Sequence, residues 1–215
     1  FEMPRLFICG IFFLEEIHMQ KKSIARALTE SAIMVALATV LSIIKIVDLP
    51  YGGSITIASM LPIAIISYRY GTIWGLGTGI VYAAIQQLLG LKTLSWVTGW
   101  QSILAVIMLD YIVAFAIVGL AGVYRKVIKN QAYALAVGSL FVCVLRYICH
   151  VISGCTVWAG LSIPTTAALT YSFIYNATYM IPETIVMVAA AFYIGSAIDF
   201  TSDSPKRIKI EEKTK

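Results

Sequence analysis

The sequence predicts an all-α membrane protein with six transmembrane helices and both termini in the cytoplasm. Of its 215 residues, 60% are hydrophobic and only 13% are charged, whereas soluble domains average about 25% charged residues. The sequence contains several apolar segments, and their lengths approach the roughly 20 residues that a helix needs to cross a bilayer. Segments of about ten residues with alternating polarity, typical of transmembrane β-barrels, are absent from the sequence.

Six hydrophobic segments, separated by turn-forming or basic residues, predict the six helices. We place them near residues 27–45, 55–69, 71–91, 101–123, 132–156 and 168–198. The glycines, prolines and basic residues that predict the breaks lie at 49–53, 68–71, 90–92, 125–126 and 163–164. The second segment is short and contains Pro62, so we expect it to be kinked or partly re-entrant. Internal repeats are not evident, and residues 23–200 are predicted to form one membrane domain.

Both ends of the chain are expected to lie outside that domain. The sequence opens at Phe1, and Met19-Gln20-Lys21-Lys22 resembles a more natural beginning. We therefore expect residues 1–22 to be an N-terminal extension and cytoplasmic tail, with no functional role for 1–18. Residues 201–215 are predicted to form a basic cytoplasmic tail.

The distribution of Lys and Arg predicts the orientation, because cytoplasmic loops carry an excess of these residues. With six spans, the side that holds both termini would carry Lys21, Lys22, Arg26, Arg69, Arg125, Lys126, Lys129, Lys206, Arg207, Lys209, Lys213 and Lys215. The opposite side would carry only Lys45 and Lys92. This asymmetry explains the net charge of +5 without a nucleic-acid partner.

Polar and aromatic residues in the last three predicted helices are candidates for a binding site. An ionisable group at membrane depth costs roughly 2.5–3.5 kcal/mol on insertion scales and usually marks a functional site. On the last helix, Ser172, Asn176, Tyr179 and Glu183 follow helical spacing and form one stripe. The full set of candidates is Asp110, Tyr111, Arg146, His150, Trp158, Tyr171, Tyr175, Asn176, Tyr179 and Glu183. The predicted orientation places them in the outer half of the membrane.

The side chains in this set favour a flat, nitrogen-rich cation as the ligand. Aromatic faces attract organic cations, and a carboxylate with an amide can recognise the edge of a heteroaromatic ring. Structural roles are the alternative: Arg146 could form a buried ion pair with Asp110 or Glu183 that only holds helices together. Trp158 and Tyr171 could be interfacial belt residues.

The pattern Arg146-Tyr147-x-x-His150-x-x-Ser153-Gly154-x-x-x-Trp158, followed by Tyr171-Ser172-x-x-x-Asn176, resembles the thiamine-specific substrate-binding subunit of energy-coupling factor transporters. The resemblance covers roughly residues 23–200. It implies a six-helix fold in which His150, Trp158, Tyr171 and Asn176 line a thiamine pocket. The pair Asp110-Tyr111 stands where the family pattern has Glu-Tyr.

The resemblance also implies partners. In the family, a motif similar to Ala32-x-x-x-Ala36 docks on a transmembrane coupling subunit, and small residues of this kind let membrane helices pack closely. The sequence has no phosphate-binding Gly-x-x-x-x-Gly-Lys-Ser/Thr loop. Transport would therefore need two partner ATPase subunits in a prokaryotic cell membrane. The implied ligand is thiamine, with no cofactor and no metal.

Other functions remain as alternatives. The same architecture could carry another vitamin or a thiamine precursor. An intramembrane protease would need a nucleophile and base within hydrogen-bond reach, and only His150 and Ser153 lie close enough in sequence to be considered. A channel or secondary transporter is disfavoured because inverted repeats and broken helices are not evident.

Overall fold

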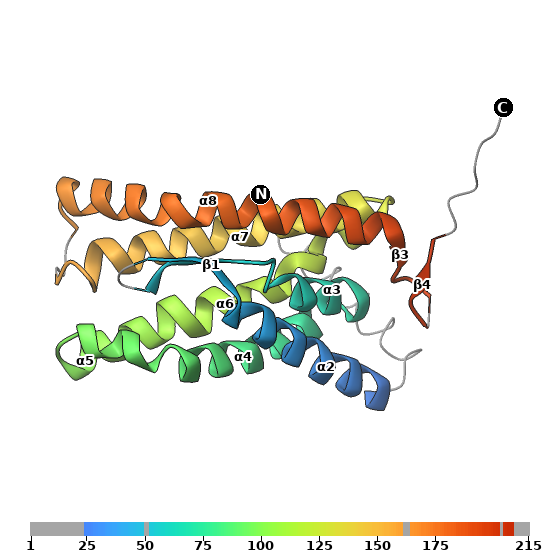
Figure 1. Ribbon diagram of the computed structural model, residues 1–215, viewed down its shortest axis with the longest axis horizontal. Coiled ribbons are helices and arrows are strands. Elements are labelled where there is room, and N and C mark those ends of the chain that lie inside the picture. The colour runs from blue at the N-terminus through green and yellow to red at the C-terminus, as the bar shows by residue number, and fades with distance from the viewer. Residues whose placement is uncertain (1–23, 50–51, 161–163, 203, 209–215) are drawn as a thin grey trace, which may run out of the picture.

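The computed structural model describes residues 24–49, 52–160, 164–202 and 204–208. The predicted extension at 1–22 lies outside the described residues, as do residues 209–215 of the predicted C-terminal tail. The described chain is mostly helical and forms an elongated bundle (Figure 1). The end of α7 (Gln131–Thr156) and the start of α8 (Thr166–Ala197) lie at one end, and the strands β3 (Ile198–Asp199) and β4 (Lys206–Arg207) lie at the other.

The helices agree closely with most of the predicted segments. They are α2 (Ile24–Ile43), α3 (Leu61–Tyr70), α4 (Thr72–Leu89), the 3-10 helix η2 (Leu91–Trp96), α5 (Trp100–Val106), the π-helix η3 (Ile107–Val113), α6 (Ala114–Ala116), the 3-10 helix η4 (Ile117–Lys126), α7 (Gln131–Thr156) and α8 (Thr166–Ala197). The strands are β1 (Lys45–Asp48), β2 (Ser54–Thr56), β3 (Ile198–Asp199) and β4 (Lys206–Arg207).

Among the described residues, four stretches are long and apolar enough to cross a membrane: α2, the run from α5 through η4 (Trp100–Lys126), α7 and α8. The two remaining predicted spans correspond to shorter helices, because α3 has 10 residues and α4 has 18. Gly71, with φ of 102°, ends α3 and separates it from α4. A positive φ of this kind is readily adopted by glycine.

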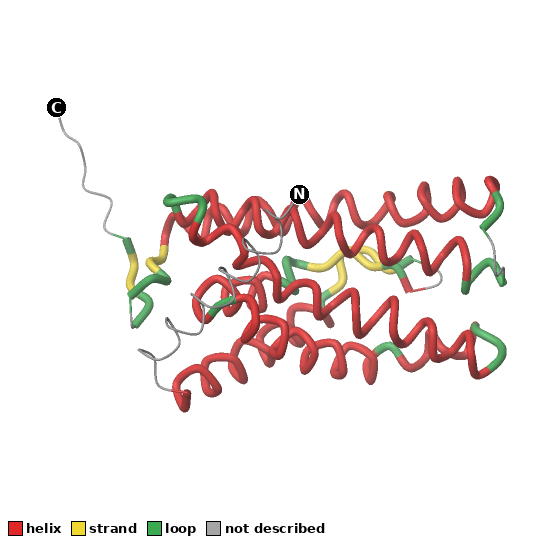
Figure 2. Tube along the Cα trace, turned by 180° about the vertical axis from the view of Figure 1, so that it is seen from behind, coloured by secondary structure: helices red, strands yellow, loops and turns green. Residues whose placement is uncertain are grey.

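The predicted helix at 55–69 was wrong over its first part. Residues Ser54–Thr56 form β2, which pairs antiparallel with β1, and α3 begins only at Leu61. Pro62 stands in the first turn of α3, where its missing N–H costs no helical hydrogen bond. The resulting β1–β2 hairpin lies between the α7–α8 pair and the α4–α6 segments, and Figure 2 shows its strands in the middle of the bundle.

The fourth predicted span is continuous but irregular. It changes from α-helix to π-helix at Ile107 and to 3-10 helix at Ile117. Ser67 of α3 bonds to this last part: its hydroxyl donates to the carbonyl of Gly119 and accepts from the N–H of Gly122 at 2.9 Å. Glycines permit this close approach of backbone to backbone. The π-helical turn, a feature frequent at functional sites, contains Asp110.

Helices α7 and α8 form an antiparallel pair with capped N-termini. The side chain of Asn130 accepts from two backbone N–H groups at the start of α7, and Thr165 caps α8 by accepting from Ala168 at 3.2 Å. The stripe predicted on α8 is confirmed as a buried face: Ser172, Asn176, Tyr179 and Glu183 are all buried.

Arg69 fastens the end of the bundle opposite the α4–α5 connection. This buried side chain pairs with Glu30 of α2 at 2.6 Å and donates to the carbonyl oxygens of Phe200 and Ser202. On α2 itself, Ala38 is fully buried, whereas Ala32 and Ala36 are exposed. The two alanines of the predicted docking motif therefore lie on the outward face of the bundle.

Candidate ligand-binding cavity

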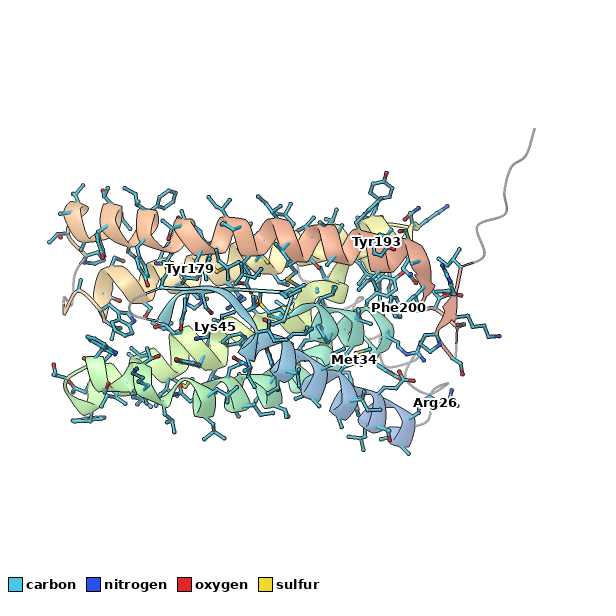
Figure 3. The ribbon with its side chains drawn as sticks, viewed as in Figure 1. Arg26, Met34, Lys45, Tyr179, Tyr193 and Phe200 are labelled. Carbon is cyan, nitrogen blue, oxygen red and sulfur yellow. The ribbon has the colours of Figure 1, made fainter. Side chains whose placement is uncertain are left out.

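A cavity of about 820 Å³ lies between α7, α8, η3 and the β1–β2 hairpin, and the ends of α2 and α4 complete its rim. The ten polar and aromatic side chains singled out in the sequence all line it: Asp110, Tyr111, Arg146, His150, Trp158, Tyr171, Tyr175, Asn176, Tyr179 and Glu183. Figure 3 labels Tyr179 on the side of α8 that faces the hairpin, and Lys45 on the hairpin itself. Residues from distant parts of the sequence thus meet in one space.

Asp110 is the centre of a hydrogen-bond network that joins η3 to the end of α7. Its Oδ1 lies 2.9 Å from Nδ1 of His150. Its Oδ2 accepts from the hydroxyl of Ser153 at 2.7 Å and from the indole N–H of Trp158 at 3.0 Å. The side chains of Asp110 and His150 are 14% and 12% exposed, so water competes little for these bonds.

Asn176 forms a second network that fixes the α7–α8 contact. Its amide N–H groups donate to the carbonyl of Ser172 at 2.8 Å and to that of His150 at 3.3 Å. Its carbonyl oxygen accepts from the hydroxyl of Tyr179 at 2.6 Å. Beside this network, the hydroxyl of Ser172 donates to the backbone carbonyl of Val151 at 2.9 Å. Because these bonds define both ends of the amide, Asn176 is held in one orientation.

Glu183 fastens the hairpin to α8. Its two carboxylate oxygens accept from the backbone N–H of Thr56 at 3.0 Å and from the Thr56 hydroxyl at 2.8 Å. Farther along the hairpin, Gly53 lies against the rings of Tyr179 and Tyr175, and a Cβ at this position would come within 2.8 Å of the Tyr179 ring. The hairpin therefore forms one wall of the cavity. It is held there by the two hydrogen bonds to Glu183 and by its close contact with the ring of Tyr179.

Arg146 does not form the ion pair that was considered from the sequence. Its contacts among the described residues are the sulfur of Met60 and the ring of Phe115, whose centroid lies 4.5 Å from the guanidinium carbon. Its buried Nε atom has no hydrogen-bond partner in the described part of the chain. Asp110 instead accepts from the neutral side chains of Ser153 and Trp158. Glu183 accepts from the neutral hydroxyl of Thr56.

The inner part of the cavity carries more carboxyl groups than cationic side chains. Among the described lining residues, Asp110 and Glu183 supply two carboxyl groups, and Arg146 is the buried cation. At the rim, Lys45 and Asp48 pair with each other at 3.0 Å, and Lys92 is exposed to solvent, which weakens its influence. A buried cationic ligand would restore the charge balance inside.

Aromatic rings complete the walls. Tyr171 and Tyr175 stack with centroids 6.1 Å apart, and His150 meets Tyr179 edge to face at 6.3 Å. Trp96 lines the rim and is 61% exposed. Trp100 is 73% exposed and is not among the residues that line the cavity.

Sequence reasoning missed several contributors to the site. Ser153 was not predicted to contribute to the binding site, and Thr56, Met60 and Phe115 were not singled out, although each contacts a cavity residue. The pair Gly52-Gly53 was the one available signal for the hairpin, since such pairs favour tight turns between strands. The described residues contain no cluster of three potential metal ligands.

Comparison with known proteins identifies the family. The family model of the thiamine transporter protein (Thia_YuaJ) matches residues 28–200. The chain belongs to this family. The thiamine transporter ThiT of Bacillus subtilis is 36% identical over 178 residues, which cover 78% of this chain and 88% of that protein.

A solved structure agrees on the fold. ThiT from Listeria monocytogenes superposes with a TM-score of 0.63 at 22% identity, over 80% of this chain and 93% of that one. At this identity the likeness shows the fold alone. It places the described helices in the same arrangement as a family member.

Proposed function

We propose that the chain is the thiamine-binding subunit of an energy-coupling factor importer and captures thiamine from outside the cell. The observation that carries the proposal is a cavity with aromatic walls and two inner carboxyl groups, in a chain that belongs to the thiamine transporter family. Thiamine contains a positively charged thiazolium ring, which suits aromatic faces. Its second ring, an aminopyrimidine, offers donors and acceptors along a flat edge.

Within this cavity we assign the ligand contacts to the aromatic and polar groups of η3, α7 and α8. Asp110, Tyr111, His150, Trp158, Tyr171 and Asn176 form this set. Arg146, Tyr175, Tyr179 and Glu183 support the walls or add contacts. Since the polar groups already bond to one another, the cargo would use the exposed ring faces and the lone pairs that these networks leave unused.

We also propose six membrane spans, with both termini cytoplasmic and the cavity in the outer half. The support is the separation of basic residues along the bundle. Lys206 and Arg207 belong to the β3–β4 hairpin at one end, whereas Lys92 follows α4 toward the opposite end (Figure 1). By the positive-inside rule, the end with β3–β4 faces the cytoplasm. The chain would then be a multi-pass protein of a bacterial cell membrane.

Transport requires partners in this proposal. The subunit would dock on a transmembrane coupling protein, which two ATPase subunits drive. The exposed position of Ala32 and Ala36 on α2 is consistent with a docking role, because small residues allow another helix to approach closely. No cofactor is needed for the binding step, since thiamine is the cargo.

An intramembrane protease is disfavoured by a specific contact. A serine nucleophile must donate its hydroxyl proton to a histidine base. Here Ser153 donates to Asp110, and His150 bonds to the other oxygen of the same carboxylate. A related vitamin or a thiamine precursor remains the alternative cargo for the same cavity.

Quenching of intrinsic tryptophan fluorescence in folded, detergent-solubilised protein tests the proposal. Thiamine, its isolated pyrimidine and thiazole fragments, and riboflavin should be titrated in parallel. We expect saturable quenching with thiamine, weaker binding of each fragment and none with riboflavin. Saturable quenching by riboflavin but not by thiamine would reject thiamine as the substrate. Cleavage of a membrane peptide by the purified chain would reject the transporter assignment.

A further inference from the structure

The network around Asp110 constrains the protonation of His150. The indole N–H of Trp158 can only donate, so Oδ2 of Asp110 must accept. The hydroxyl of Ser153 donates to the same oxygen. Both donors bind Oδ2, so Oδ1 is the carboxylate oxygen that faces the imidazole. An ionised carboxylate has no proton to give, so the proton in its 2.9 Å contact with His150 must reside on Nδ1 of the imidazole.

The other imidazole nitrogen faces a different environment. His150 lines the cavity, and its Nε2 has no hydrogen-bond partner among the described residues. Four charged or titratable groups lie around the ring: Asp110 on η3, Arg146 one turn away on α7, and both Tyr179, edge to face, and Glu183 of α8. A ring whose proton sits on Nδ1, facing Asp110, leaves Nε2 to accept a hydrogen bond from the cavity.

We propose that Asp110, in addition to its place among the ligand contacts, positions His150: it holds the imidazole as the Nδ1–H tautomer so that Nε2 offers an unprotonated acceptor to the cargo. This inference rests on the proposed function for the identity of the cargo only. Nε2 of His150 would then bind a ligand group that donates an N–H or O–H. Asp110 simultaneously fixes the indole plane of Trp158 through the same carboxylate, so one side chain orients two walls of the cavity.

The tautomer can be measured without any ligand. The chain contains two histidines, so a His18→Gln background leaves His150 as the only imidazole. Nitrogen-15 NMR of histidine-labelled protein then separates protonated from unprotonated ring nitrogens. We expect a protonated Nδ1 and an unprotonated Nε2. A protonated Nε2, or an imidazolium with both nitrogens protonated near neutral pH, would overturn the proposal.

Variants separate positioning from general damage. In Asp110→Ala, Nδ1 loses its acceptor, and we expect the spectrum to show a mixture of tautomers and thiamine affinity to fall about 10- to 100-fold, as for loss of hydrogen bonds to a charged group. Ser153→Ala is the matched control, because Ser153 bonds to the same carboxylate but not to the imidazole. In Ser153→Ala, the tautomer of His150 should stay unchanged. An unchanged tautomer in Asp110→Ala would refute the role of Asp110.

Failure of this inference is distinguishable from failure of the proposed function. The NMR measurement uses cargo-free protein, so its outcome does not depend on thiamine binding. Absence of thiamine binding with the expected tautomer would reject the cargo and leave Asp110 as the residue that positions His150. Thiamine binding with the opposite tautomer would reject the positioning role alone.

Discussion

Replacing Thr56 with valine should loosen the β1–β2 hairpin from α8. The substitution keeps the shape of the side chain and removes only the hydroxyl, which donates to Glu183 at 2.8 Å. A hydrogen bond to a charged group contributes about 1.5–3 kcal/mol. The backbone N–H of Thr56 keeps its own bond to Glu183 at 3.0 Å, so the hairpin should remain folded but open more often. The energy corresponds to an about 10- to 150-fold larger open population.

Amide hydrogen exchange followed by mass spectrometry measures this opening directly. The peptide that contains Thr56 should exchange about 10- to 150-fold faster in the variant if exchange requires the hairpin to leave α8. Thr178→Val is the matched control, because the exposed Thr178 hydroxyl donates to the Tyr175 carbonyl of its own helix at 2.7 Å. Equal exchange rates for Thr56→Val and the parent protein would refute the claim that Glu183 fastens the hairpin.

Three further predictions address the packing, the end of the bundle and the aromatic wall. Gly154→Ala should destabilise the protein by about 1–3 kcal/mol in thermal unfolding, because the added Cβ would collide with Ser172. Gly77→Ala is the control, because its added Cβ meets open space, and it should show no such loss. Arg69→Gln should lower the free energy of unfolding by about 1–3 kcal/mol, since it breaks a partly buried ion pair, and an unchanged melting temperature would contradict this. Trp158→Ala should weaken thiamine binding at least about 10-fold in fluorescence titration, and parent-like affinity would remove it from the site.

The part of the fold that depends on helical spacing could be predicted from the sequence. The interval between Ser172, Asn176, Tyr179 and Glu183 places these residues on one face of any α-helix, whatever its neighbours do, and the face is buried. Long apolar runs similarly predicted α7 and α8 to within a few residues. These features are local, and periodicity is sufficient to find them.

The β1–β2 hairpin could not be predicted in this way. The two strands, at 45–48 and 54–56, are too short for periodicity to separate strand from helix. The hairpin is stabilised by contacts with Glu183 and Tyr179, which lie more than a hundred residues away in sequence. Tertiary contacts of this kind override local preference.

The partners of the buried charges were also beyond sequence reasoning. Opposite charges on neighbouring helices suggested an ion pair for Arg146, yet its guanidinium lies over Phe115. The carboxylate of Asp110 is turned to Ser153 and Trp158 instead. Which partner a side chain reaches depends on the rotation of the helix that bears it. The π-helical turn of η3 changes that rotation locally.

Isothermal titration calorimetry of thiamine into the purified, folded chain tests the central claim most directly. The claim is that a cavity with an inner excess of carboxylates and aromatic walls captures this organic cation without any partner subunit. We expect saturable binding at a single site per chain, and loss of that binding in Trp158→Ala. Absence of heat and of fluorescence change with thiamine, in protein that remains folded, would contradict the account.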